Sequence, residues 1–243
     1  MVVSDDYRYV FIELPHTGST AIHQELCEHY SGRPVLAKHA RYHEFLAQAT
    51  PDQRDYFSFS CVRHPMDEAV SLYFRYKTNH AGRYTDPAKL RRNGGSVSEH
   101  SVKAHRFIRD NDADFVDFFR YYYRRPYDSW SNLSHTRLSF VIRFERLEQD
   151  FEALLERLEL EPVRQLPRLN KTDARRHDFW SYYPENIRDR ARRIFGPFML
   201  EWGFEFPDDW GDYDVPRSDR LAFLVWRAGR RIYWRAFGNR LFG

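Results

Sequence analysis

One segment near the N-terminus, residues 9–26 (YVFIELPHTGSTAIHQEL), constrains the fold more than any other. Its apolar run at residues 9–14 predicts a buried strand, which Pro15 ends. A short turn of glycine and hydroxyl residues follows, and a helical pattern then places Ile22 and Leu26 on one face. A strand that leads into a helix through a small polar loop is typical of α/β proteins.

The turn after this strand has the composition of an anion-binding loop. The first N–H groups of a helix lack partners, and the helix dipole favours negative charge beside them. Gly18 lets the backbone approach an anion closely, and the hydroxyls of Thr17, Ser19 and Thr20 can donate to its oxygens. The loop has neither the GxxxxGK(S/T) pattern of nucleotide triphosphatases nor the GxGxxG pattern of dinucleotide-binding proteins, so it predicts a phosphate-like ligand. The alternative is an ordinary strand-to-helix turn capped by Ser and Thr.

A second strand-to-helix junction lies at residues 55–76 (DYFSFSCVRHPMDEAVSLYFRY). Residues 56–62 predict another buried strand, and Pro65 suits the first turn of a helix. Arg63 stands between them, where it can donate two hydrogen bonds to a phosphate at the carboxyl end of the strand. A surface ion pair with Asp67 is the alternative for Arg63.

Together the two junctions resemble the sulfotransferases that use 3′-phosphoadenosine 5′-phosphosulfate (PAPS), especially their bacterial and carbohydrate-type branch. The family's 5′-phosphosulfate loop, PK(T/S)GxT(S), corresponds to residues 15–20, and its 3′-phosphate motif, VRxPxxxxxS, to Val62, Arg63, Pro65 and Ser71. Three looser matches follow the family pattern at residues 38–39 (KH), 140–151 (FVIRFERLEQDF) and 166–172 (LPRLNKT).

The resemblance implies an α/β fold: a three-layer sandwich around a central, mainly parallel sheet, related to the P-loop nucleotide triphosphatases. It implies a sulfotransferase that moves the sulfuryl group of PAPS to a hydroxyl of a carbohydrate or glycolipid. The residues expected to bind PAPS are Pro15, His16, Thr17, Gly18, Ser19, Thr20, Arg63 and Ser71, together with Lys171, Arg175 and Arg176 of a basic loop. No metal is expected, because the protein's cations would do what Mg²⁺ does in kinases.

Three residues are the candidates for catalysis. The family usually has Lys where this chain has His16, and that Lys is thought to stabilise the leaving phosphate. An imidazole is only partly charged at neutral pH, so His16 predicts either a steeper pH dependence or weakened catalysis. For the general base we expect His39, with Glu13 and His43 as alternatives, and Lys38 would assist on the sulfuryl oxygens. A non-catalytic PAP-binding protein and a kinase of related fold are the alternative functions.

The last residues, 216–243, differ in composition from the rest of the chain. Seven Arg and one Asp give this segment a charge of about +6, which leaves about −3 for the rest of a chain whose net charge is +3. On a helical wheel its arginines fall on one side and most of its large apolar residues on the other. The segment therefore predicts a basic amphipathic helix at a membrane surface. A C-terminal helix packed on the domain, with its arginine face in solvent, is the alternative.

Length and composition set the remaining expectations. The 243 residues suit a sulfotransferase domain at residues 1–210, with the helix at 216–243 as an extension. The small net charge argues against a nucleic-acid partner. Cys27 and Cys61 form no CxxC pair, which favours a reducing compartment. Golgi relatives carry a membrane anchor and stem ahead of the first strand, whereas here that strand begins within ten residues of Met1. We therefore expect a bacterial cytoplasmic enzyme, peripheral on the inner membrane if the helix binds lipid, or a chain that has lost such an anchor.

Overall fold

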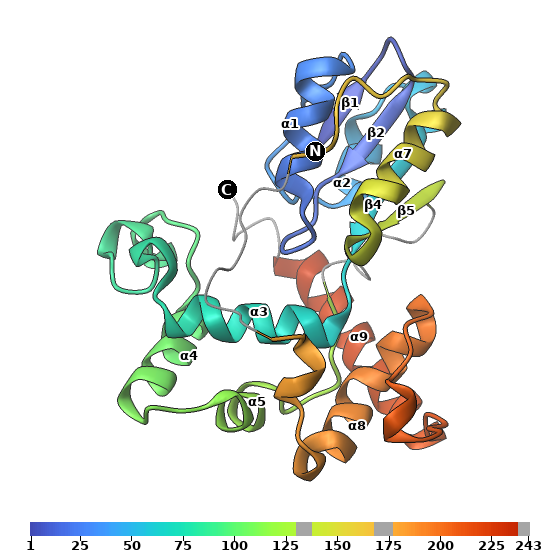
Figure 1. The fold of residues 1–243 in the computed structure, drawn as a ribbon. Coiled ribbons are helices and arrows are strands. Elements are labelled where there is room, and N and C mark those ends of the chain that lie inside the picture. Colours follow the sequence, from blue (N-terminus) through green and yellow to red (C-terminus); the bar gives the residue numbers. More distant parts are fainter. Residues whose placement is uncertain (130–137, 168–176, 238–243) are drawn as a thin grey trace. The chain divides into compact units, whose positions relative to one another are not determined.

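A computed structural model describes residues 1–129, 138–167 and 177–237 of the chain (Figure 1). The chain divides into two compact units. The first comprises residues 1–64 and 128–171, and the second comprises residues 65–127 and 172–243. The expected division into 1–210 and 216–243 remains a prediction.

The first unit is built on a five-stranded sheet with the strand order β3-β1-β2-β4-β5. Its strands are β1 (Val2–Ser4), β2 (Tyr9–Ile12), β3 (Arg33–Pro34), β4 (Phe57–Val62) and β5 (Phe140–Arg143). β2, β4 and β5 are parallel, with Phe11 opposite Phe59 and Phe59 opposite Phe140. β1 pairs antiparallel with both β2 and β3. The sheet is therefore parallel in its core, and the two predicted buried strands are confirmed.

Helices cover both faces of this sheet (Figure 1). They are α1 (Ser19–His29), α2 (Tyr42–Gln48) and α7 (Leu147–Arg157), with short 3-10 helices η1 (Asp52–Asp55) and η5 (Phe144–Arg146). Successive strand residues point to opposite faces. Tyr9 and Phe11 therefore pack with α1 and α7, whereas Val10 and Ile12 pack with α2. The first unit is thus mixed α/β with a helix-flanked sheet, as predicted.

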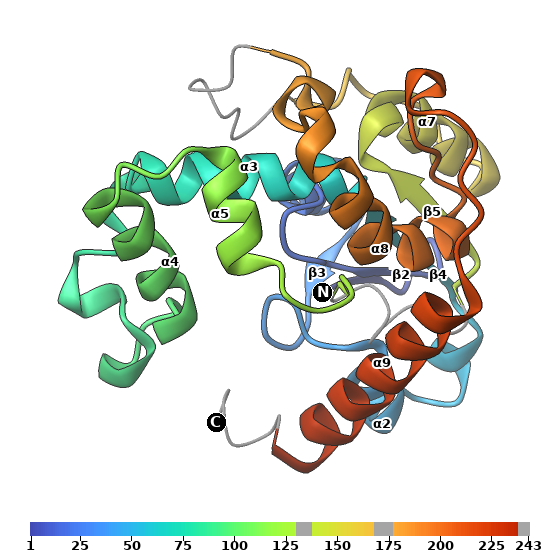
Figure 2. The same ribbon diagram turned by 90° about the horizontal axis from the view of Figure 1, so that it is seen from below.

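The second unit, where it is described, is helical. Its helices are α3 (Pro65–Lys77), α4 (Glu99–Asp110), α5 (Phe115–Tyr122), α8 (Glu185–Trp202) and α9 (Arg217–Phe237), with 3-10 helices η2 (His80–Gly82), η3 (Pro87–Lys89), η4 (Arg91–Asn93), η6 (Phe179–Tyr182) and η7 (Asp208–Trp210). Aromatic side chains fill its core: the ring centroids of Phe115 and Tyr183 lie 4.9 Å apart, and those of Phe119 and Phe195 lie 5.7 Å apart. α9 packs against α8 (Figure 2).

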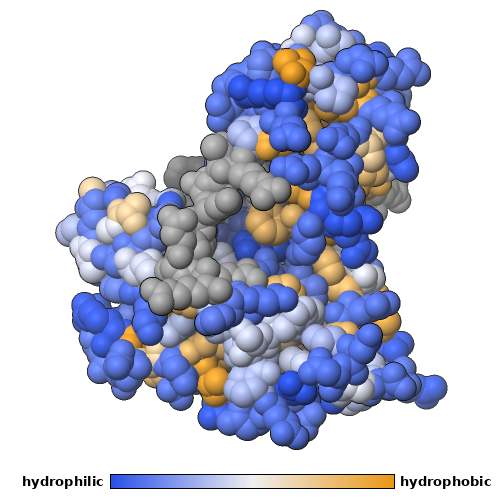
Figure 3. All heavy atoms as spheres, viewed as in Figure 1, coloured by the Kyte–Doolittle hydropathy of each residue, from blue (hydrophilic) through white to orange (hydrophobic). Residues whose placement is uncertain are grey.

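The face of the molecule in Figure 3 is mostly hydrophilic, with scattered apolar groups. This agrees with the 30% of residues that are charged. Among the helices in the described ranges, none is both long and apolar enough to cross a membrane.

Candidate active site

The loop between β2 and α1 is held together by its own hydroxyl groups. Thr17 Oγ1 and Ser19 Oγ both donate to the carbonyl oxygen of Leu14, at 3.0 and 2.8 Å. Both side chains are buried, whereas Thr20 is exposed at the start of α1. In this structure the hydroxyls of Thr17 and Ser19 therefore stabilise the conformation of the loop. Either hydroxyl could donate to a bound anion only by giving up its bond to Leu14, because a hydroxyl carries one proton.

Gly18 fixes the point where the loop becomes a helix. It lies at the N-cap of α1 with φ +75° and ψ +5°, a left-handed conformation that glycine adopts at little cost. A Cβ on Gly18 would lie 3.1 Å from Leu147 Cδ2 and 3.3 Å from the ring of Phe144. Within the described part of the chain, no side chain caps this N-terminus and no acidic residue lies in its first turn. The first N–H groups of α1 therefore form the donor edge that an anion-binding loop requires.

Lys38 brings a positive charge to this N-terminus. Its Nζ donates to Thr20 Oγ1 at 3.1 Å, although the two residues are 18 positions apart. The loop at residues 15–20 contains no Lys or Arg of its own. An ammonium group at the start of a helix is opposed by the helix dipole unless an anion lies beside it. The position of Lys38 therefore supports the predicted anion site.

His39 lies at the other side of the same loop. Its Nδ1 is 3.2 Å from the carbonyl oxygen of Glu13, which immediately follows β2. A carbonyl oxygen can only accept, so Nδ1 carries the proton, and Nε2 of the neutral ring carries the lone pair. Burial lowers the pKa of His39, which keeps the ring neutral at pH 7. Its backbone is left-handed, with φ +67°, as is that of His16, with φ +66°.

Of the alternative bases, Glu13 is less suited to this role. The carboxylate of Glu13 is buried and forms an ion pair with the amino group of Met1, and its other oxygen lies 3.2 Å from Nδ1 of His23. A carboxylate held in this way is a poor proton acceptor, because protonation would leave the buried ammonium group of Met1 without a counter-charge. His43 is exposed on α2.

Arg63 contacts the loop from the end of β4. Its Nη1 donates to the carbonyl oxygen of His16 at 3.2 Å, and its guanidinium carbon lies 4.2 Å from the ring centroid of Phe144. β2 and β4 are parallel neighbours, so their carboxyl ends lie at the same edge of the sheet. The structure therefore brings together two motifs that are 47 positions apart in the sequence.

A model of the sulfotransferase family matches residues 1–196 of this chain. The chain belongs to the sulfotransferase family. Neither the comparison with curated proteins nor that with solved structures gave a match. The matched part of the sulfotransferase includes every predicted site residue, whereas α9 follows it.

The remaining predicted site residues of the sulfotransferase are Ser71, Pro15 and three residues that lie outside the described ranges. Ser71 is buried on α3 and belongs to the second unit, and its role at the 3′-phosphate stays a prediction. Lys171, Arg175 and Arg176 lie outside the described residues. Pro15 is half-buried at the start of the loop.

Phe144 lies beside Arg63 and Gly18 of the candidate site and was not among the residues predicted from the sequence. It follows β5, the third parallel strand, and its ring contacts Arg63 and closes the space beside Gly18. The next residue, Glu145, accepts a 2.6 Å hydrogen bond from the backbone N–H of His64, so the ends of β4 and β5 are tied together. An aromatic residue directly after a predicted parallel strand was the available signal, because ligand sites lie at this edge of an α/β sheet.

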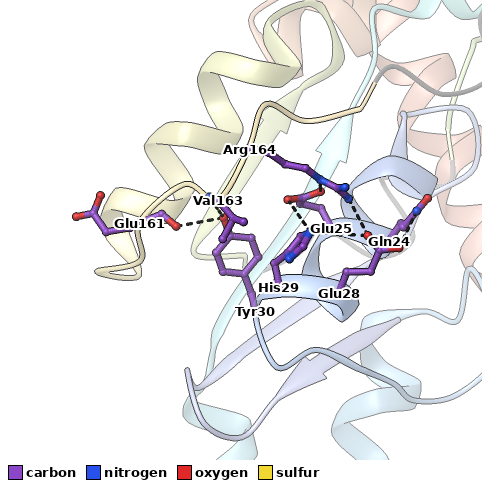
Figure 4. A network of polar contacts seen from close by, with 8 residues as sticks. All are labelled: Gln24, Glu25, Glu28, His29, Tyr30, Glu161, Val163 and Arg164. Carbon is purple, nitrogen blue, oxygen red and sulfur yellow. Dashed lines mark hydrogen bonds and ion pairs between the residues drawn. The ribbon is translucent and has the colours of Figure 1, made fainter.

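The far end of α1 is fixed by a separate polar network (Figure 4). Glu25 is fully buried, and its carboxylate accepts from Nε of Arg164 at 2.9 Å, whereas Nη2 of Arg164 donates to the carboxylate of Glu28 at 2.7 Å. The hydroxyl of Tyr30 accepts from the N–H of Val163 at 3.1 Å. These contacts join α1 to the segment after α7 and so help to hold the helix whose N-terminus faces the site.

Proposed function

We propose that this sulfotransferase moves the sulfuryl group of PAPS to a hydroxyl of a carbohydrate or glycolipid acceptor, without a metal. One observation carries the proposal. Two cationic side chains from distant segments, Lys38 and Arg63, both contact the loop at the N-terminus of α1. A loop that gathers helix N–H groups and two cations is suited to a donor that carries several anionic groups. The site would then correspond to that of the P-loop-like sulfotransferase fold.

The donor would lie along this edge of the sheet. The N–H groups at the start of α1 and the ammonium of Lys38 would bind the phosphosulfate. Arg63 would bind the 3′-phosphate, since a guanidinium is planar and can form two parallel hydrogen bonds to a phosphate. Its bond to the His16 carbonyl and its stacking on Phe144 would hold that plane in one orientation.

The reaction is an in-line displacement at sulfur. The acceptor hydroxyl oxygen attacks, the bond between sulfur and the bridging oxygen breaks, and that oxygen leaves with the nucleotide, 3′-phosphoadenosine 5′-phosphate (PAP). Nε2 of His39 would take the hydroxyl proton, since Nδ1 already donates to Glu13. Negative charge develops on the bridging oxygen, where Lys38, the helix N-terminus and a protonated His16 would stabilise it.

The test is binding and transfer with matched variants. Arg63→Ala should weaken PAP binding, measured by calorimetry, on the order of 10- to 100-fold, the usual value of charge-assisted hydrogen bonds. Arg33→Ala is the control, because Arg33 pairs with Asp5 on the surface of the same unit. Unchanged affinity in Arg63→Ala would overturn the assignment of Arg63.

A screen with labelled PAPS against sugars, glycolipids and phenols then identifies the acceptor. Transfer to phenols alone would exclude the carbohydrate and glycolipid assignment. PAP binding without transfer to any acceptor would favour the non-catalytic protein instead. Phosphate transfer that requires Mg²⁺ and ATP would favour the kinase.

A further inference from the structure

Helix α9 lies beyond the part of the chain that matches the sulfotransferase family, so the family's chemistry does not account for it. One side of this 21-residue helix packs on the second unit. Phe223 is buried there, and Arg227 lies 4.9 Å from its ring centroid and forms a 2.6 Å ion pair with Glu201 of α8. Arg125 lies 4.5 Å from the ring centroid of Trp226. The side that faces the protein is therefore a mixture of aromatic rings and paired arginine.

The opposite side of α9 presents large apolar side chains to solvent. Their exposed fractions are 63% for Leu221, 48% for Leu224, 65% for Val225, 69% for Ile232 and 49% for Tyr233. We call these five residues the apolar stripe. Residues four, seven and eleven apart lie close together around a helix, so Leu221, Val225 and Ile232 share one face, and Leu224 and Tyr233 flank that face on its two sides.

The exposed side of α9 thus carries large apolar residues as well as arginines. The side chain of Arg227 is only 15% exposed, whereas Ile232 and Val225 are among the most exposed apolar residues of the described chain. Arg227 therefore lies on the packed side of α9, whereas Arg217 and Arg220 are exposed. The alternative of a packed helix with arginines in solvent remains open. An exposed strip of this kind indicates a surface that is covered in use.

The positive charge of α9 favours an anionic membrane over a second copy of the protein as the surface that covers the stripe. Residues 216–243 carry about +6, and Arg217 and Arg220, at the start of the helix, are exposed beside the stripe. A second copy of this helix would bring like charges together, which disfavours self-association. An anionic membrane instead offers apolar chains for the stripe and negative headgroups for the arginines. α9 is not apolar enough to span a bilayer, so it would lie along the surface.

We propose that α9 binds the surface of an anionic membrane, with the apolar stripe in the acyl boundary and the arginines at the level of the headgroups. Tyr233, near the end of the stripe, suits the polar boundary of the bilayer, because its ring is apolar and its hydroxyl is polar. The proposal does not depend on the donor or acceptor of the sulfotransferase. It assigns lipid as a partner of the second unit.

The test is flotation of the full-length protein with vesicles of phosphatidylcholine alone and with about one third phosphatidylglycerol. The wild type should float with the anionic vesicles and much less with the neutral ones, and added salt should weaken binding. The double variant Leu221→Gln/Ile232→Gln should reduce flotation at least about tenfold, because two apolar side chains are lost from the buried face. The control is Val163→Gln/Leu200→Gln, which changes two aliphatic residues that are 59% and 53% exposed elsewhere.

Other readouts separate the outcomes. All four substituted residues are exposed, so melting temperature and PAP affinity should be unchanged in both double variants. Equal loss of flotation in the control variant would overturn the role of the stripe. Wild-type protein that stays off anionic vesicles would overturn the proposal. Equal binding to neutral and anionic vesicles would also overturn it. So would the finding that the wild type is a dimer, that Leu221→Gln/Ile232→Gln is a monomer, and that neither the wild type nor this variant binds lipid.

Discussion

Replacing Gly18 with Ala should destabilise the first unit and weaken PAP binding together. The backbone of Gly18 is left-handed, and an L-residue there costs about 1 kcal/mol. The new Cβ would also approach Leu147 Cδ2 to 3.1 Å and the Phe144 ring to 3.3 Å, so both side chains must shift by a few tenths of an ångström. Together these effects should lower the free energy of unfolding by about 1 to 2 kcal/mol, or the melting temperature by roughly 3 to 8 °C.

The same substitution reaches Arg63 through Phe144. The Phe144 ring lies 4.2 Å from the guanidinium of Arg63, the residue that we propose binds the 3′-phosphate. Displacing the ring should therefore also move the guanidinium. PAP affinity, measured by calorimetry at a temperature where the variant is folded, should fall on the order of tenfold. Gly94→Ala is the matched control: Gly94 has φ +86°, but its Cβ would meet nothing within 4 Å. Equal loss of stability in Gly18→Ala and Gly94→Ala, or an unchanged PAP affinity in Gly18→Ala, would contradict this role of Gly18.

Three further predictions concern single features of the structure. His39→Asn should lower kcat on the order of 10²- to 10⁴-fold and abolish the fall of kcat at acid pH. Because burial lowers the pKa of His39, this fall should occur below pH 6.5 in the wild type. A variant whose kcat still falls at the same acid pH would exclude His39 as the base. Arg164→Met should lower the melting temperature by leaving the buried carboxylate of Glu25 without this partner, whereas Arg164→Lys should lower it less; equal melting temperatures would contradict this. Cys61 is buried, and its burial raises the pKa of the thiol. A thiol reagent should therefore label half-buried Cys27 in the native protein and Cys61 only after unfolding. Labelling of both cysteines in the native state would contradict the burial of Cys61.

The strand-to-helix junctions were predictable because their signals are local. Buried parallel strands read as short apolar runs, and residues 9–14 and 56–62 correspond to β2 and β4. Pro65 begins α3, as its fixed φ and missing N–H favour. Gly18 was identified from the composition of the loop, and its positive φ agrees with the close approach expected of it. Residues whose conformation is set by their immediate neighbours could therefore be placed from the sequence.

The remainder of the site depends on contacts that no local pattern encodes. Phe144 meets Gly18 across more than a hundred residues, because β5 lies beside β4 in the sheet. β1 has three residues and pairs antiparallel between β3 and β2, and a run of three residues is too short for periodicity to detect. The hydroxyls of Thr17 and Ser19 were expected on the ligand, yet the structure uses both on the Leu14 carbonyl. The sequence shows that hydroxyl groups are present in the loop, and only the fold shows which acceptor they contact.

His16 stands where the resemblance led us to expect a lysine, and the structure places Lys38 beside the same loop. A lysine inside the loop and a lysine from a following segment can bring the same charge to the same helix N-terminus. The second arrangement has a consequence that the first lacks, because Lys38 and His39 are adjacent. Leu36 and His39, on either side of Lys38, both have left-handed backbone conformations, with φ +59° and +67°. Lys38 contacts Thr20 and His39 contacts Glu13, and these contacts help to hold the segment. Backbone strain of this kind concentrates at functional sites. In the mechanism that we propose, stabilisation of the leaving group by Lys38 and removal of the acceptor proton by His39 both depend on this short segment, and a displacement of it would impair both steps.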